Sequence, residues 1–572
     1  MSMSTDMAAG TDDVAVVSRR PSDRLGALLY SANAWTIVCV AAAAFEAFNG
    51  RHAMNADGIS YLEMAQNALR HGPSALVNGY WSPGYPVLIA GVFCLVRPTV
   101  AEEFPLIHAI NLILFAATVW IFRVLVNAWT SDAQPEERSG SSRPGSLLVP
   151  IGFGFMLLIA IVAVPPSLVT PDLAVLATTF LIALAVRRSA QSGTWISACA
   201  IGAVCALGYW LKTAMFPLGA TLLALLFAFP PPVPLARAKA IAAAAVWAVL
   251  TIPLIALISA RLGRLSFGET GHLNYAWYVL HWNVVETFTP YGQLVHPPRV
   301  LLDAPRVVEF GSPVPGTFPP HYDPSYWGEG TPAHFALRPQ LGALAVTGFE
   351  YLREVLFDYP VVFATLIGLA LARRGLQRLI ENWKTVHPLA LWSVAWLALY
   401  GAVHVENRLV APAVFLLVAA VATRLLIGVP PAAATSIAGV LAGAVVLQLA
   451  AQGWSVIRQA RDEGPPQYLT IADGLKNLGL TPATRIAIVG PGDGSRPSFA
   501  HAAGLTIAAE IIEDGGSTAV TDDNVSTVKA ALARAGIRAI VRVNGPLAAA
   551  ASEWRRIPLG DGSAAGVLLT TP

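Results

Sequence analysis

A small set of ionisable side chains stands where apolar stretches begin or end, and these residues are the best suited to chemistry. Asp57 follows the first apolar run, and Asp172 comes directly after a proline in TPDLAVLA. Lys212 lies in GYWLKTAMFP, and Arg408 lies in HVENRLVAP together with His404. A carboxylate can act as a general base, whereas Lys and Arg can stabilise negative charge that develops on a leaving group. Ionisable groups at membrane depth are costly and tend to be functional.

Each of these side chains also has a structural interpretation. Asp57 opens the amphipathic stretch DGISYLEMAQNALRH, so it could cap a helix that lies on the membrane surface, and Asp172 could be a cap as well. Lys212 could extend to the interface, and Glu406 with Arg408 could form a local ion pair. Their joint placement on one side of the membrane favours a functional site.

The composition is that of a polytopic membrane protein. Of 572 residues, 55% are hydrophobic and 13% are charged, whereas soluble domains contain roughly 25% charged residues. The mean hydropathy is +0.57. A net charge of +2 gives no indication of nucleic-acid binding. The 4 cysteines all fall in apolar stretches, which indicates packing residues rather than a disulfide framework or a zinc site.

Apolar stretches of about 20 residues predict roughly eleven membrane crossings. The stretch 83–97 is short and bounded by prolines, so we expect it to enter the membrane without crossing it. A cleaved signal peptide is an alternative for the first stretch, but its apolar run is long for that role. The predicted spans are 27–48, 104–126, 147–164, 173–186, 194–211, 214–229, 238–260, 358–372, 388–403, 409–427 and 435–454.

Basic residues support this count through the positive-inside rule. Arginines before the first span place an N-terminal tail, residues 1–26, in the cytoplasm. If 83–97 does not cross, all the later basic loops fall on that side; if it crossed, the rule would fail repeatedly. The ionisable residues described above then gather outside. The basic residues are Arg19, Arg20, Arg24, Arg138, Arg143, Arg187, Arg188, Arg237, Lys239, Arg373, Arg374, Arg378 and Lys384.

Two outer loops, at about 49–103 and 261–357, are dense in aromatic residues, histidine and proline. Long loops of this kind are usually functional, and their composition suits sugar faces and lipid headgroups. The alternative is a lid that packs over the cavity through its own aromatics. A zinc site from His281, His296 and His321 is also conceivable but lacks tight ligand spacing. The candidate substrate contacts are Tyr61, Tyr80, Trp81, His296, Arg299, His321, Asp323 and Trp327.

The character of the chain changes after about residue 455. Periodicity predicts helices at 468–479 and 525–536, and strands at 485–490, 505–512 and 537–543. Residues 455–572 are therefore expected to form a small α/β domain outside the membrane, with residues 27–454 as the transmembrane domain. The glycine-rich VGPGDGS lacks dinucleotide-binding spacing, so we expect a role as a cap or a docking unit.

The order of these features resembles the GT-C superfamily of membrane glycosyltransferases, in the branch of protein O-mannosyltransferases, aminoarabinose transferases and rhizobial lipopolysaccharide sugar transferases. The resemblance covers about 1–430 and rests on short motifs: the outer-loop Asp57, the turn WSPGYP, TPDLAVLA, GYWLKTAMFP and ENRLVAP. Tyr80 and Trp81 replace an acidic–basic pair common in aminoarabinose transferases, and Leu409 replaces a common tyrosine. These departures leave the sugar and the acceptor open.

The resemblance implies a polyprenyl-phosphate-linked sugar as donor and an extracytoplasmic lipid, glycan or protein as acceptor, at the plasma (inner) membrane. Asp57 would be the general base of one inverting displacement. Lys212 and Arg408 would stabilise the leaving phosphate, with His404 and Glu406 beside them as substrate contacts. The second outer acid would orient the acceptor or hold a divalent cation with the first; no ion is assigned.

Two functions of other classes remain as alternatives. A transporter or flippase of a lipid-linked saccharide should show paired, interrupted helices in its two halves. The long first outer loop and the polar cluster on one face favour the enzyme instead. A membrane scaffold whose outer domain binds envelope partners is the third interpretation, and charges at the span ends argue against it.

Overall fold

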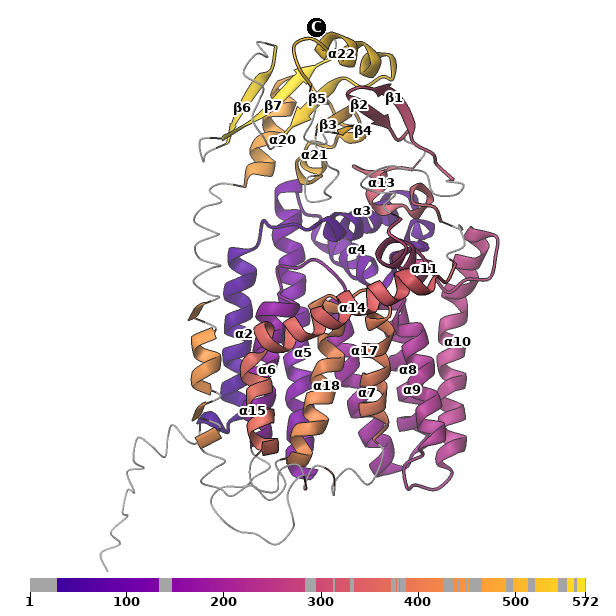
Figure 1. Ribbon diagram of the computed structural model, residues 1–572, viewed down its shortest axis with the longest axis vertical. Coiled ribbons are helices and arrows are strands. Elements are labelled where there is room, and N and C mark those ends of the chain that lie inside the picture. The colour runs from indigo at the N-terminus through magenta and orange to yellow at the C-terminus, as the bar shows by residue number, and fades with distance from the viewer. Residues whose placement is uncertain are drawn as a thin grey trace, which may run out of the picture.

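The chain forms a helical bundle that carries a β-sheet at one end (Figure 1). The predicted cytoplasmic tail, 1–26, lies outside the residues that this computed structural model describes. Those residues are 28–132, 147–282, 295–311, 314–329, 334–371, 377, 380, 387–425, 436–437, 439–440, 442–448, 450–451, 466–489, 497–512, 520–543, 553–559 and 563–570.

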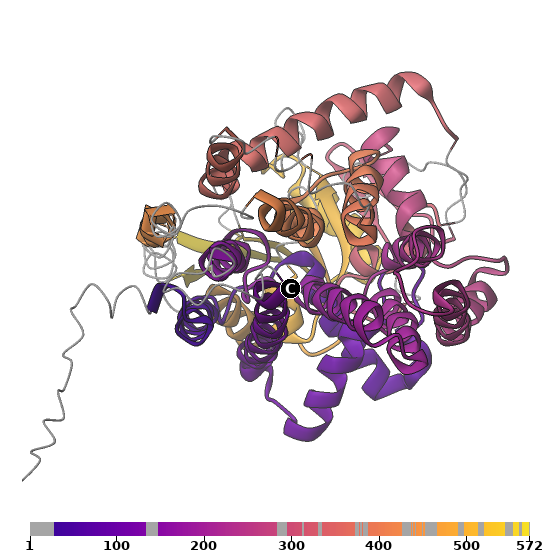
Figure 2. The same ribbon diagram turned by 90° about the horizontal axis from the view of Figure 1, so that it is seen from below.

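The bundle helices stand side by side, as the view along their axes shows (Figure 2). Within the described residues, helices occupy the predicted spans, and four of them, α5, α7, α10 and α18, are long and apolar enough to cross a membrane. We therefore describe a membrane protein, and the number of crossings stays a prediction. The helices are α2 (Ala32–Asn49), α5 (Val100–Asp132), α6 (Leu148–Leu158), α7 (Asp172–Ser192), α8 (Trp195–Leu211), α9 (Met215–Ala228), α10 (Ala236–Leu262), α15 (Pro360–Leu371), α17 (Pro388–Gly401) and α18 (Asn407–Leu425).

Aromatic side chains fix the central helices relative to one another. Phe415 of α18 stacks on Phe155 of α6, with ring centroids 5.2 Å apart, and lies 5.1 Å from Phe180 of α7. All three rings are buried. Such ring pairs add to the burial of apolar area. Because α7 begins at Asp172 and Arg408 lies in the first turn of α18, this packing also fixes the distance between those two side chains.

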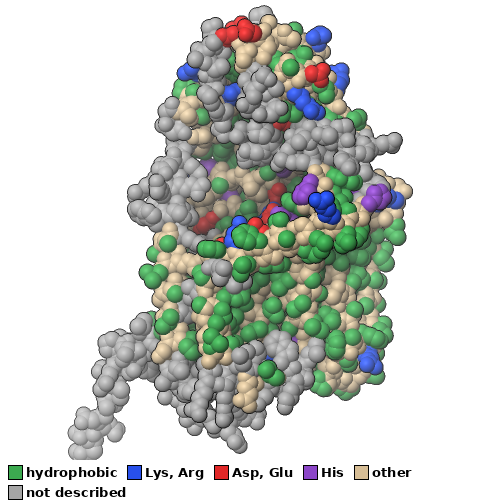
Figure 3. Space-filling view, viewed as in Figure 1, with side chains coloured by type: hydrophobic (Ala, Val, Ile, Leu, Met, Phe, Trp, Pro, Cys, Tyr) green, Lys and Arg blue, Asp and Glu red, His purple; other side chains and the backbone are tan. Residues whose placement is uncertain are grey.

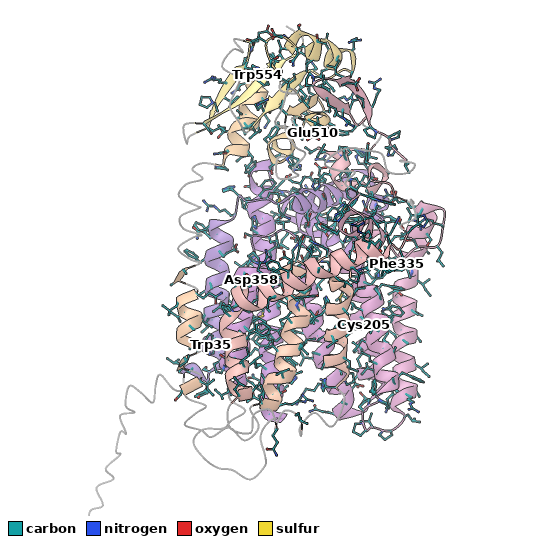
Figure 4. The ribbon with its side chains drawn as sticks, viewed as in Figure 1. Trp35, Cys205, Phe335, Asp358, Glu510 and Trp554 are labelled. Atoms are coloured by element: carbon teal, nitrogen blue, oxygen red, sulfur yellow. The ribbon has the colours of Figure 1, made fainter. Side chains whose placement is uncertain are left out.

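Close backbone packing positions α8 beside α10. An added Cβ at Gly202 of α8 would lie 2.0 Å from the carbonyl oxygen of Ala243 in α10, so only glycine allows this approach. Cys205, one turn further along α8, is buried in the bundle (Figure 4). The contact holds the end of α8 at Leu211, directly before Lys212.

The stretch around Asp57 forms the helix α3 (Ala56–His71), which is buried from Gly58 to Asn67, and the short helix α4 (Gly84–Val96) follows it. Both lie between the bundle and the sheet (Figure 1). The interpretation of Asp57 as the helix cap is corrected: Asn55 is the N-cap residue, and Asp57 lies in the first turn. The Asn55 side chain accepts a hydrogen bond from the backbone N–H of Val169 at 3.0 Å instead of from its own helix.

The sheet has seven described strands in the order β1-β2-β4-β3-β5-β7-β6. Its centre is parallel, and the predicted strands and helices near 468–543 lie within a few residues of observed ones; the glycine-rich stretch lies mostly outside the described residues. The elements are β3 (Arg485–Val489), β4 (Thr506–Ile512), β5 (Ala539–Arg542), β6 (Arg555–Leu559), β7 (Ser563–Leu569), α20 (Gln467–Asn477), α21 (Ser498–Ala503) and α22 (Val525–Arg534).

The second outer loop contributes structure that the sequence analysis did not predict. The hairpin β1 (Arg299–Asp303) and β2 (Arg306–Glu309) joins the sheet through antiparallel pairing of β2 with β4. The helix α14 (Leu337–Arg353) runs across the face of the bundle (Figure 1). It exposes Val346 and Phe349, which suits a helix that lies in the lipid interface. Hydrophobic side chains cover this helix and the bundle below it (Figure 3).

A buried ion cluster ties the sheet region to the helices beneath it. His501 of α21 lies 2.7 Å from Glu103 of α5 through Nε2, and 3.5 Å from Glu63 of α3 through Nδ1. Burial disfavours the imidazolium, but the two carboxylates outweigh it and raise the pKa of His501 to about 9. The cluster is therefore charged at neutral pH and holds α21 against the helix that carries Asp57.

A candidate active site at the head of the bundle

A cavity of about 390 Å³ lies where several helices end beneath α3. Asp172 is the first residue of α7, Lys212 directly follows α8, and Arg408 lies in the first turn of α18. Asp57 comes from the first turn of α3 above them. These side chains line one cavity because their helices begin or end at the same level. Acidic, basic and histidine side chains are visible in a hollow above α14 (Figure 3).

Arg408 connects the carboxylates of the cavity. Its Nη1 atom lies 2.9 Å from Asp57 Oδ2 and 3.6 Å from Asp172 Oδ2, and its Nε atom donates to Glu406 Oε2 at 2.6 Å. The Asp57 side chain is 27% exposed, whereas that of Asp172 is 2% exposed. The carboxylate that can be reached from the cavity is therefore Asp57, and Asp172 is the buried partner.

Asp172 anchors both cations of the cavity. Its Oδ1 atom pairs with the ammonium of Lys212, and its Oδ2 atom accepts a hydrogen bond from Thr170 Oγ1 at 2.8 Å. Removing one partner from a buried ion pair is strongly destabilising because the other charge is left unpaired. Asp172 thus holds Lys212 and Arg408 in position before any ligand arrives.

The proline turn predicted from WSPGYP packs against this corner of the cavity. An added Cβ at Gly84 would lie 2.8 Å from the carbonyl oxygen of Trp210, two residues before Lys212. Ser82 Oγ of the turn lies 3.2 Å from Oγ1 of Thr213, the residue that directly follows Lys212. The turn therefore supports the backbone that presents Lys212.

Glu406 and His404 form the side of the cavity nearest α17. His404 Nε2 lies 3.1 Å from Glu406 Oε1, and the His404 ring stacks on Tyr278 with centroids 3.7 Å apart. Burial disfavours the Glu406 carboxylate, but the hydrogen bond from His404 and the charge of Arg408 lower its pKa to about 2. Glu406 therefore remains charged, and part of the Arg408 charge is neutralised by it.

An aromatic wall closes the opposite side. The ring of Tyr80 lies 4.8 Å from Trp81 and 5.5 Å from Trp277, and Tyr61 lies 5.1 Å from Trp81. The Tyr80 hydroxyl donates to Asn274 Oδ1 at 3.0 Å. Burial raises the pKa of Tyr80, so this hydroxyl stays protonated. The wall combines flat apolar rings with hydrogen-bonding edges, as suits a sugar face.

Other predicted contacts lie outside this cavity. His321 Nδ1 is 3.2 Å from Ser60 Oγ on α3, and His296 Nδ1 is 2.7 Å from Ser325 Oγ. Trp327 is buried behind the wall, 5.1 Å from Tyr80.

The two remaining predicted contacts form ion pairs within the outer loop. Asp323 accepts two hydrogen bonds from Arg261, at 3.1 and 3.2 Å. Arg299 belongs to β1, where it pairs with Glu309 of the neighbouring strand at 3.0 Å. Both pairs stabilise loop and sheet structure around the head of the bundle.

A divalent cation does not fit the pair of Asp57 and Asp172 as they are arranged. The guanidinium of Arg408 reaches both carboxylates, so the position between them holds a positive charge already. Within the described part of the chain, no group of three His, Cys, Asp or Glu residues gathers as a metal site would require. The histidines considered for zinc, His296 and His321, bond to different serines.

Sequence reasoning missed several residues that line or support the cavity. Thr170 lies in VTPD, where it donates a hydrogen bond to the Asp172 side chain two residues further on. Asn274, Tyr278 and Tyr400 also line the cavity. They come from the outer loop and from α17, and no local pattern marks them because tertiary packing alone brings them there.

The comparisons with known proteins concern the fold. ArnT from Cupriavidus metallidurans in the apo state matches with a TM-score of 0.53 and 13% identity over 94% of this chain and 98% of that chain. The same protein bound to undecaprenyl phosphate matches with a TM-score of 0.51 and 13% identity over 95% and 99%. The archaeal oligosaccharyltransferase AglB from Archaeoglobus fulgidus, in complex with an inhibitory peptide and a dolichol-phosphate, gives a TM-score of 0.44 at 13% identity over 89% and 69%.

No family model matches the sequence, and no curated protein matches it. The two ArnT structures cover nearly all of both chains, so this chain shares the fold of ArnT. The predicted resemblance to the GT-C membrane proteins is thereby confirmed at the level of the fold.

Proposed function

We propose that this chain is a GT-C-like glycosyltransferase that moves a sugar from a polyprenyl phosphate to an acceptor hydroxyl. The observation that carries the proposal is one cavity that brings together an accessible carboxylate, Asp57, and two cations, Lys212 and Arg408. A protein of the same fold has been solved with undecaprenyl phosphate bound, which supports a lipid-linked phosphate as the donor. The sugar and the acceptor stay open.

Asp57 acts as the general base in one displacement. The acceptor oxygen attacks the anomeric carbon as the bond from that carbon to the phosphate oxygen breaks. The acceptor proton passes to the Asp57 carboxylate, and the polyprenyl phosphate leaves with the bonding electrons. A single attack from the face opposite the phosphate inverts the configuration at the anomeric carbon.

Lys212 and Arg408 stabilise the phosphate as its charge increases. Arg408 can offer two N–H groups to phosphate oxygens, and such charge-assisted bonds are about twice as strong as neutral ones. In this structure Arg408 donates to Asp57, so an arriving phosphate competes with that carboxylate for the guanidinium. Loss of this hydrogen bond frees the Asp57 oxygen to accept the proton of the acceptor, which couples donor binding to release of the base.

Asp172 is a positioning residue in this mechanism. Its side chain is buried and holds Lys212 and Arg408, so it fixes the cations without reaching the substrate. No step depends on a divalent cation, because these charges are already paired within the protein. The aromatic wall around Tyr80 and Trp81 orients the sugar or the acceptor.

We place the cavity on the extracytoplasmic side. Arg187, Arg188 and Arg237 lie at the opposite ends of helices that begin or end at the cavity, as the positive-inside rule requires. In this topology residues 27–454 form the transmembrane domain, and residues 455–572 form an outer α/β domain that also takes the hairpin β1–β2 from the loop.

Sugar transfer from radiolabelled polyprenyl-phosphate sugars into membrane acceptors tests the proposal. Asp57→Asn keeps the shape of the side chain and removes the base, so transfer should fall by about 10²-fold or more. The matched control is Asp473→Asn, because Asp473 is an exposed carboxylate on α20, far from the cavity in the chain. Undiminished transfer by a stably inserted Asp57→Asn protein would refute the assignment. Movement of the labelled lipid across the membrane without transfer would indicate a transporter.

A further inference from the structure

A second cavity, of about 680 Å³, lies at the other end of the bundle. It is lined by the last turns of α7, the start of α8, the turn between α9 and α10, and the start of α17. On α7, Asp172 lines the first cavity and Arg187 the second, which are about 22 Å apart along an α-helix. The two cavities are therefore separate sites.

Lys239 gives this cavity its chemical character. The residue is 6% exposed, and its ammonium donates to the backbone carbonyl of Pro234 at 2.6 Å. It also lies 5.8 Å from the centre of the Trp195 ring. Within the described residues, Lys239 has no carboxylate partner. An ammonium that is buried without an anion has lost its hydration without gaining a charge partner, which is costly.

The lining contains a second basic side chain. Arg187 also lines the cavity, and its Nη2 donates to the carbonyl of Ala128 at 3.3 Å. Among the lining residues that the structure describes, there is no Asp or Glu. Apolar side chains, with the run Pro230 to Pro232, form much of the remaining wall. The cavity thus combines two cations with apolar walls, which matches an amphiphilic anion.

The positive-inside rule alone does not explain why Lys239 is buried. Basic residues that only set orientation are expected at the surface, and the neighbouring Arg188 and Arg237 are indeed exposed. Lys239 instead extends inward between helices. Basic pockets between transmembrane helices on the cytoplasmic side are a known way to bind phosphate headgroups.

We propose that this cavity binds a phosphate group, that of an anionic phospholipid headgroup, with the ammonium of Lys239 and the guanidinium of Arg187 as its partners. The apolar walls around Trp129 and Phe229 would contact the start of an acyl chain. The site is distinct from the Asp57 cavity, and its existence does not depend on the glycosyltransferase proposal.

Native mass spectrometry of the purified full-length protein tests this site with phosphatidylglycerol as the probe. The wild type should retain one tightly bound phosphatidylglycerol. Lys239→Met should weaken its binding by about tenfold or more, because a charge-assisted hydrogen bond is lost. Lys239→Arg should keep the binding, and Arg237→Met, which removes an exposed charge two residues away, should leave it unchanged.

Inorganic phosphate distinguishes the two sources of this chemistry. If millimolar phosphate does not displace phosphatidylglycerol, the ligand is a lipid headgroup; displacement would overturn the lipid and indicate a soluble phosphate. Equal binding by wild type and Lys239→Met would overturn the site itself. So would an equal loss in Arg237→Met, since it would show that surface charge alone attracts the lipid. Thermal melting of each variant confirms that it remains folded.

Discussion

The two cavities at the ends of the bundle use the same cationic residue types in opposite ways. At the head of the bundle, Lys212 and Arg408 pair with carboxylates, so their positions are fixed without a ligand. At the other end, Lys239 is buried in a cavity that Arg187 also lines, and no carboxylate among the described residues pairs with Lys239. Paired cations are organised for charge that develops during a reaction, whereas an unpaired buried cation depends on an anion that is already charged.

This difference also separates catalysis from binding. Donors that are held in place before reaction stabilise a transition state without reorganisation. A carboxylate-paired arginine gives up one partner for another, so its net affinity for a phosphate is modest. A buried lysine without an anion gains much more when one binds, since the desolvation cost is already present.

The largest expected effect concerns Arg408. Arg408→Gln removes the group that contacts Asp57 and would contact the phosphate, so transfer should fall by about 10²- to 10³-fold. Arg408→Lys should recover only a small part of this loss, because an ammonium cannot bond phosphate in the bidentate manner of a guanidinium. Transfer of labelled sugar from the polyprenyl phosphate measures both variants. Full activity of Arg408→Gln would remove the contrast between the two cavities.

The buried cluster of Glu63, Glu103 and His501 joins the sheet region to α3, the helix that carries Asp57, and makes the stability of the protein depend on pH. The pKa of His501 is raised to about 9, so its stabilising contribution is complete below its unfolded pKa of about 6.5 and is lost as the pH rises through about 9. The melting temperature of the wild type should therefore fall by several degrees between about pH 6 and pH 10. In His501→Gln this fall should be much smaller, and the two proteins should converge at high pH. If His501→Gln retains the wild-type pH profile, His501 is not the group that sets the pH dependence.

One substitution applied in both cavities compares them directly. Lys212→Met leaves the buried Asp172 with Thr170 and with Arg408, which is 3.6 Å away, so we expect stability to fall by about 3 kcal/mol, as for a broken buried ion pair. Lys239→Met removes an ammonium that has no carboxylate partner in the described part of the chain. In detergent without anionic lipid, it should leave the melting temperature unchanged or raise it. Two variants that lose stability equally would mean that the cations are held alike.

From the sequence, those residues of the Asp57 cavity could be predicted whose positions depend only on where a helix begins or ends. Asp172, Lys212 and Arg408 each lie within one or two residues of a helix end, so counting spans places them at the same level. The sequence could not predict that Arg408 faces both carboxylates, because the rotation of α18 depends on the packing of Phe415. Nor could it distinguish a helix cap from an accessible acid at Asp57, because Asn55, two residues earlier, is an equally suitable cap and occupies that position.

Contacts between segments that are distant in sequence were the main feature that the sequence did not predict. The strands of the hairpin β1–β2 are short, and they join a sheet only through β4, which lies far along the chain. The cluster of Glu63, Glu103 and His501 similarly joins three elements that are distant in sequence. Such contacts depend on the tertiary fold, whereas helices in the bundle follow from local apolar composition.

The smallest expected effect concerns Arg299, which the sequence analysis grouped with the substrate contacts. Its side chain is 64% exposed and pairs with Glu309 within the hairpin, outside both cavities. Exposed pairs of this kind contribute roughly 0–1 kcal/mol. Arg299→Ala should therefore leave both sugar transfer and phosphatidylglycerol binding at wild-type levels, with a small change in melting temperature. A large loss of transfer would mean that the sheet reaches the substrate, and the head cavity would then have to include the hairpin as part of its acceptor site.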